Sequence, residues 1–140
     1  MSSDAAKLAY DPIENIIWMS FPTPVELNTR QQIAEHFGHV VKFWRTRAGG
    51  KKVYFVVNFD NVTINAGELE FYAEQTRRAH EMCAIASVRY GGNPLQRTVT
   101  RLAGMKIHLP SNIYETREEA LAVVRKLKEG EITVDAAAAR

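Results

Sequence analysis

The sequence has little cysteine, no long apolar run and no excess of charge of one sign. Cys83 is the single cysteine among 140 residues, so an internal disulfide is excluded and a reducing compartment is expected. The apolar runs fall short of the roughly 18 residues that a membrane span needs. The first residues, Met1–Ala6, have neither the basic start nor the apolar core of a secretion signal. These absences predict a cytoplasmic protein with no membrane span.

Nucleic-acid and metal partners are not expected either. The formal net charge is +2, and the basic residues are spread among acidic ones instead of forming a patch with aromatic residues. His36 and His39 lie three residues apart, whereas His80 and His108 are solitary, so the spacing of a metal site is missing. We interpret His36 and His39 as helix-surface residues, and we predict no metal and no cofactor.

Patterns that carry catalysis are also missing. Ser87 lies within a predicted strand and Cys83 at a helix–strand boundary, so burial of a small side chain explains each, and neither belongs to a nucleophile elbow. Glu118-Glu119 opens a helix, where the helix dipole favours acidic residues. The glycines of Gly49-Gly50 precede a strand and lack the spacing of a phosphate-binding loop. We therefore predict that the protein is not an enzyme.

What the sequence does contain is the composition of one globular domain. Hydrophobic residues make up 46% and charged residues 24% of the chain, as in ordinary soluble domains. We expect a single domain over residues 1–130 and a flexible C-terminal tail over residues 131–140, because the tail offers little to bury.

Strands and helices alternate along the domain with short connections. This order predicts an α/β fold with a mixed, mostly parallel sheet of about five strands, begun by an N-terminal hairpin, and about four helices. Capping boxes, helix-stopping glycines and apolar periodicity set the expected elements. These are strands Leu8–Tyr10 and Ile16–Phe21, a helix between Asn28 and Gly49, strand Val53–Phe59, a helix between Asn65 and Cys83, strand Ala84–Tyr90, a helix between Asn93 and Gly104, strand Lys106–Leu109, the extended pair Ile113-Tyr114, and a helix between Thr116 and Gly130.

The stretch Val53–Leu69 is the centre of this pattern. Its first half is almost wholly apolar, as in a strand covered on both faces, and its second half turns at Asp60-Asn61 into a helix near Asn65. Asn65 is expected as the N-cap and Glu68 as the third helical residue, where it would complete the cap. A strand followed by a helix N-terminus exposes backbone N–H groups, so we expect a binding surface at this turn.

A second strand-to-helix turn is expected at Gly91, Gly92 and Asn93. Both turns follow parallel strands, so they should lie side by side at the same sheet edge, with Arg89 or Arg97 nearby. This arrangement suits an anion or a polar metabolite. It therefore predicts one functional class, a small-ligand sensor that binds at the turns near Asn65 and Asn93.

The string Val56–Leu69 resembles the central signature of STAS domains, the sulfate-transporter and anti-sigma-factor-antagonist family. That signature is an apolar strand, a short turn and the phrase Asp-Ser-Ser-Gly-Leu at the start of a helix. The segments Ala84–Tyr90, Asn93–Gly104 and Ile113–Val124 are similar to the strand, helix and closing strand–helix that follow it in the family. The resemblance covers roughly residues 8–128, the size of one domain, and implies the STAS fold.

The phosphoacceptor of that family is not matched. Its second Ser falls on Gly67 if Leu69 is aligned with the Leu of the signature and one turn residue is deleted, and on Glu68 without the deletion. Asn58 also replaces the usual Asp at the strand end. Neither alignment supplies a hydroxyl, so the chain looks closer to a branch of small bacterial proteins of similar fold that lack the motif. Glu68 is then either a fixed negative charge in place of the phosphate or only a helix cap.

The resemblance implies a second functional class, a non-enzymatic regulatory protein-interaction module without a phosphorylation switch. Its partner would be another protein, such as a regulator or a kinase-like protein, or a second copy of the chain. The residues that we expect at the partner- or ligand-binding surface of the two classes lie in the two turns and just after them: Asn61, Asn65, Gly67, Glu68, Gly91, Gly92, Asn93 and Arg97.

Overall fold

A computed structural model describes residues 6–93, 97–98 and 113–130 of the chain. The main sheet has five strands in the order β1-β2-β4-β6-β7. β1 runs antiparallel to β2, and the other neighbours pair in parallel. The predicted N-terminal hairpin and mixed, mostly parallel sheet are thereby confirmed. The strands are β1 (Lys7–Asp11), β2 (Ile16–Ser20), β4 (Val53–Asn58), β6 (Ala84–Tyr90) and β7 (Ile113–Tyr114).

Two further strands, which the sequence did not predict, form a small parallel sheet. They are β3 (Val25–Leu27) and β5 (Val62–Ile64). β3 comes directly after Pro22 and Pro24, and each strand is only three residues long, too short for a periodic pattern. The described part of the chain therefore has seven strands against the five or so expected.

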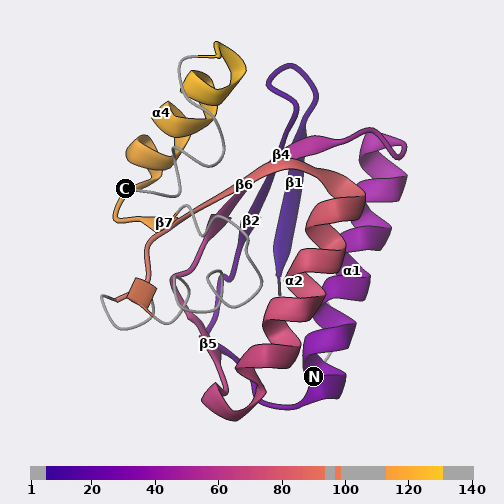
Figure 1. The fold of residues 1–140 in the computed structure, drawn as a ribbon, viewed down its shortest axis with the longest axis vertical. Coiled ribbons are helices and arrows are strands. Elements are labelled where there is room, and N and C mark those ends of the chain that lie inside the picture. Colours follow the sequence, from indigo (N-terminus) through magenta and orange to yellow (C-terminus); the bar gives the residue numbers. More distant parts are fainter. Residues whose placement is uncertain (1–5, 94–96, 99–112, 131–140) are drawn as a thin grey trace.

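The helices cover both faces of the main sheet. Figure 1 shows α1 (Arg30–Ala48) and α2 (Leu69–Cys83) side by side on one face and α4 (Arg117–Lys128) on the other. α1 and α4 begin with the predicted capping boxes at Thr29 and Thr116. α1 ends at Gly49, whose left-handed conformation (φ 64°) is one that glycine adopts without a steric penalty.

The central strand β4 divides the core into two halves. Val53, Phe55 and Val57 pack toward α1 and α2, whereas Val56 packs with α4. The expectation that this strand is covered on both faces is confirmed. Cys83, at the end of α2, is fully buried, as predicted for a small apolar residue.

Several predicted elements fall outside the described residues. Most of the helix between Asn93 and Gly104, the strand Lys106–Leu109 and the tail over residues 131–140 lie there, although residues 97–98 are helical. The described part contains three α-helices. Within the described ranges, no helix is long and apolar enough to cross a membrane.

The two capping boxes provide a test of the layered arrangement. We expect Thr29→Ala and Thr116→Ala each to lower the free energy of unfolding by about 1 kcal/mol, because each hydroxyl accepts a backbone N–H at 3.1 Å. The losses should add in the double variant, since the two helices lie on opposite faces of the sheet. Urea denaturation measures all three values. Thr46→Ala, at an exposed position within α1, is the control, and a loss there as large as at Thr29 would contradict the assignment.

Candidate functional site

The start of the first predicted turn meets the second at the carboxyl ends of β4 and β6, whereas Asn65 and Glu68 contact other segments. The N–H of Phe59 donates to the carbonyl of Tyr90 (2.8 Å), which extends the pairing of the strands by one residue. The Asp60 carboxylate then accepts from the N–H of Gly92 (2.8 Å). The structure thus brings Asp60 against the Gly91-Gly92 turn, and we call this region the corner.

Arg97 belongs to the same corner. Its guanidinium donates from Nη1 to the carbonyl of Gly92 (2.9 Å) and, more weakly, to that of Gly91 (3.4 Å). The N–H of Arg97 also donates to the carbonyl of Asn93 (3.1 Å). The side chain expected to bind an anion therefore holds the backbone of its own turn.

The two asparagines of the first turn hold the small sheet in place. Asn61, in a left-handed conformation (φ 69°), donates its amide to the carbonyl of Phe21 (2.9 Å). Asn65 donates its amide to the carbonyl of Asn28 (2.9 Å) and accepts from the N–H of Gly67 (3.0 Å). Their side chains tie the approach to α2 to the segments that flank β3.

The expectation for Glu68 is corrected. Asn65 caps a short 3₁₀ turn, η2 (Ala66–Glu68), before α2 begins at Leu69. The N–H of Asn65 donates to the carbonyl of Leu27 (3.0 Å) and not to Glu68, so no capping box forms. The Glu68 carboxylate instead forms an ion pair with Arg30 at the start of α1 (3.1 Å). Tertiary contact with another helix has displaced the local cap.

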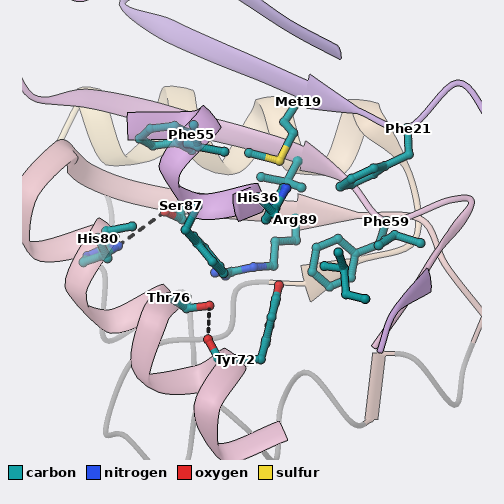
Figure 2. Close-up of a pocket in the computed structure, with 16 residues that line it drawn as sticks. Met19, Phe21, His36, Phe55, Phe59, Tyr72, Thr76, His80, Ser87 and Arg89 are labelled. Carbon is teal, nitrogen blue, oxygen red and sulfur yellow. Dashed lines mark hydrogen bonds between the residues drawn. The ribbon is translucent and has the colours of Figure 1, made fainter. Parts of the chain in front are cut away.

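A second region, which the sequence did not predict, is a cavity between the sheet and the helices α1 and α2. It offers about 60 Å³ to the centres of water-sized molecules. β6 contributes Ser87 and Arg89 to it, and α2 contributes Tyr72, Thr76 and His80. Figure 2 shows these side chains converging, with the Tyr72 hydroxyl directed toward Arg89. His80 Nδ1 and Ser87 Oγ are 3.3 Å apart.

The sequence signal for this cavity is the alternation of apolar and polar residues along β6. Ala86 and Val88 are buried, and Val88 packs with α4. Ser87 and Arg89, on the other face, stand opposite Phe55 and Val57 of β4. Polar residues at alternate positions of a strand between two covered faces indicate a polar interior, a signal that the strand assignment alone did not use.

His36 corrects another expectation. It is 8% exposed and is not a helix-surface residue. Its ring lies against Phe21 (centroids 5.7 Å apart) and Phe37 (4.9 Å) and lines the cavity. Burial, aided by the neighbouring His39, lowers the pKa of His36 from 6.5 to about 4, so the ring is neutral at pH 7.

Burial also shifts the pKa values of the other titratable side chains that line the cavity. Burial lowers the pKa of Arg89, opposed by the nearby Tyr72 hydroxyl, and burial raises the pKa of Tyr72. Burial also lowers the pKa of His80, followed by the charges of Arg89 and Lys52. Within the described part of the chain, no three His, Cys, Asp or Glu side chains gather as a metal site.

Gly91 gives a prediction for the corner. A Cβ there would lie 2.8 Å from both Asn58 Oδ1 and Asp60 Oδ1, and these oxygens already accept the N–H groups of Asp60 and Gly92. We expect Gly91→Ala to cost about 1–3 kcal/mol more than Gly49→Ala. Gly49 is the matched control, because its φ is also positive but no atom would contact the added Cβ. Equal losses in urea denaturation would contradict the packing of the corner.

The lowered pKa of His36 predicts how the free energy of unfolding depends on pH. The folded protein holds its pKa at about 4 and the unfolded chain near 6.5, so between these values the unfolded chain binds a proton that the folded protein does not. Its contribution to stability is therefore complete above pH 6.5 and is lost as the pH falls toward 4, by up to about 3 kcal/mol. His36→Leu should weaken this acid destabilisation, measured as the free energy of unfolding from pH 7.5 to 4.5, and His39→Leu should weaken it much less, because burial is the larger cause of the shift. An identical pH slope in wild type and His36→Leu would refute the assignment.

Comparison with known proteins shows which known fold this chain is similar to. No protein-family model matches the chain, and no curated protein matches its sequence. Among solved structures, the chain is similar to the Bacillus cell fate determinant SpoIIAA in the phosphorylated form, with 15% identity and a TM-score of 0.52. The match covers 86% of this chain and 100% of that one. SpoIIAA is a STAS-domain anti-sigma factor antagonist, so the STAS-like fold expected from Val56–Leu69 is confirmed.

Proposed function

We propose that this chain is a non-enzymatic regulatory module that binds another protein through the corner and the start of α2, without a phosphorylation switch. The observation that carries the proposal is the exposed turn before α2. Asn65, Ala66 and Gly67 are all exposed, yet the turn is fixed to the body of the protein by the hydrogen bonds of Asn65. A surface that is already ordered loses little conformational entropy when a partner binds.

The ion pair between Arg30 and Glu68 extends this surface across two helices. It joins the first turn of α1 to the turn before α2, and the Arg30 guanidinium also lies 5.1 Å from the centre of the Phe71 ring. Arg30 is 70% exposed and Glu68 25% exposed at their side chains. Such an exposed pair adds little to stability, but it presents both signs of charge in a fixed place.

The outer face of α2 continues the pattern. Arg77 lies between Glu74 and Glu81, with which it forms ion pairs, and Arg78 lies 3.5 Å from Glu74. Mixed charges in a defined order favour a complementary polar partner and disfavour others. They support a specific protein surface as the partner and offer no uniform field for a polyanion.

No residue between Asn65 and Leu69 carries a hydroxyl group that could accept a phosphate. The module is therefore proposed to bind its partner constitutively. SpoIIAA, which shares the fold, has been solved in a phosphorylated form. No Ser or Thr stands at the corresponding turn here, so partner binding is proposed to need no phosphate. Glu68, bound to Arg30, is proposed to contribute its charge to this surface.

Ligand sensing at the turns near Asn65 and Asn93 stays an alternative prediction. Among the described residues, Asp60, Asn65 and Arg97 all bind neighbouring backbone groups. An anion at this place would compete with those contacts, whereas a protein partner would use the surface as it stands. This difference favours the interaction module.

Photo-cross-linking in the native cell tests the proposal. A benzophenone amino acid in place of Ala66 should yield a cross-linked product of one defined mass, because this position lies at the centre of the proposed surface. The control is the same amino acid in place of Ala122, an exposed alanine of α4 on the opposite side of the sheet. A product of twice the chain's mass identifies a second copy as the partner.

Reversing the charge of Glu68 tests whether this residue takes part in recognition of the partner and not only in folding. Glu68→Lys should lower the yield of that product about fivefold, since an exposed charge contact contributes up to about 1 kcal/mol, while the melting temperature changes little. Equal products from the two positions, or none from Ala66, would refute the interaction surface. An unchanged yield in Glu68→Lys would exclude Glu68 as a recognition residue.

A further inference from the structure

The cavity beneath α1 and α2 is larger than packing defects in protein cores. Well-packed interiors contain few voids bigger than one water molecule, and one water needs about 10–15 Å³ by the same measure. The cavity offers about 60 Å³. It therefore has room for a small organic molecule with several heavy atoms.

The lining divides the cavity into two chemically different ends. The inner end is apolar, with Met19 and Phe21 from the β2 side and Phe55, Val57 and Phe59 from the β4 side, all of which are buried. These side chains belong to the main hydrophobic cluster. A ligand that fills this end must bring apolar surface with it.

The outer end, on the β6 and α2 side, is polar. Arg89, Ser87, Tyr72 and His80 line it from β6 and α2, and all four are only partly buried. Figure 2 shows the Arg89 side chain extending into the space between β6 and α2. A guanidinium presents parallel N–H groups whose geometry matches a carboxylate, and hydroxyl groups beside it add further hydrogen bonds.

The register of the sheet explains why this placement is informative. Arg89 stands in one row with Met19 and Val57 across three strands. An apolar side chain at position 89 would continue that row and fill the space, and it would avoid the desolvation of a charged group. An arginine in this row therefore places a guanidinium on the wall of the cavity, where an acidic ligand would meet it.

His36 supplies an independent observation. Its ring lines the same cavity and is more than nine-tenths buried, and no described residue makes a hydrogen bond to either ring nitrogen. Buried polar atoms are nearly always hydrogen-bonded to protein or to something bound. A ligand polar group, or a water held with it, would satisfy this ring.

We infer that the cavity is a binding site for a small monocarboxylic acid with a compact apolar body, whose carboxylate pairs with Arg89 and whose apolar part lies against Phe55, Val57 and Phe59. The site is separate from the corner, and neither proposal depends on the other. The ligand class combines one negative charge with a body of the size of a phenyl ring or a short alkyl chain.

Titration of the isotope-labelled full chain with phenylacetate and hexanoate tests the inference. Both acids should shift the amide signals of Ser87 and Arg89 and the ring signals of His36. Transferred and intermolecular NOEs should connect the ligand to the methyl groups of Val57 and Met19. Phenylacetamide, which lacks the charge, and acetate, which lacks the apolar body, should each bind at least about tenfold more weakly.

Matched arginine variants locate the charge contact. Arg89→Met, which keeps the volume, should weaken phenylacetate binding about tenfold or more, whereas Arg78→Met, on the exposed face of α2, should leave it unchanged. If Arg89→Met does not fold, the NOEs and the amide comparison on the wild-type chain decide the question. Absence of shifts with both acids, NOEs to another region, or equal binding by acid and amide would each overturn the proposal. Cross-linking at Ala66 is expected whatever the result.

Discussion

The pairing of β4 with parallel neighbours on both sides is the constraint on which the rest of the structure depends. Its residues alternate between two cores, so Phe55 and Val57 face α1 and α2 while Val56 faces α4. Parallel neighbours require crossover connections, and the two crossover helices α1 and α2 cover one face of β4, while α4, which follows β7, covers the other. The same register puts the strand ends together at the corner and sets Ser87 and Arg89 opposite Phe55 and Val57. The proposed interaction surface and the cavity thus both depend on this one strand.

The corner and the cavity use polar residues in opposite ways. At the corner and in the turn before α2, Asp60, Asn61, Asn65 and Arg97 bind backbone groups and so give exposed turns a fixed shape. In the cavity, Ser87 and Arg89 stand opposite the apolar residues Phe55 and Val57 of β4. Polar groups that fix a shape favour protein recognition, whereas polar groups within an apolar enclosure favour a small ligand. This contrast separates the two proposals physically.

Short-range sequence patterns correctly predicted those elements that depend on residues close together in the chain. The capping residues Thr29 and Thr116, the stop at Gly49 and the apolar run of β4 act within one or two turns of chain, and each was found where expected. β3 and β5 were missed because three-residue strands have no periodicity to detect. Their stability comes from each other and from Asn61 and Asn65, residues that were read as binding groups.

The sequence by itself determined the order of the helices and main-sheet strands, the mostly parallel sheet, the caps of α1 and α4 and the absence of a phosphoacceptor hydroxyl before Leu69, because each rests on residue type or short-range spacing. Only the tertiary structure decided that Glu68 pairs with Arg30 and does not cap its helix, that His36 is buried, and that Arg89 lines a cavity. The physical reason is common to all three. Which face of an element is covered, and by what, depends on contacts between segments tens of residues apart, and these override local preference.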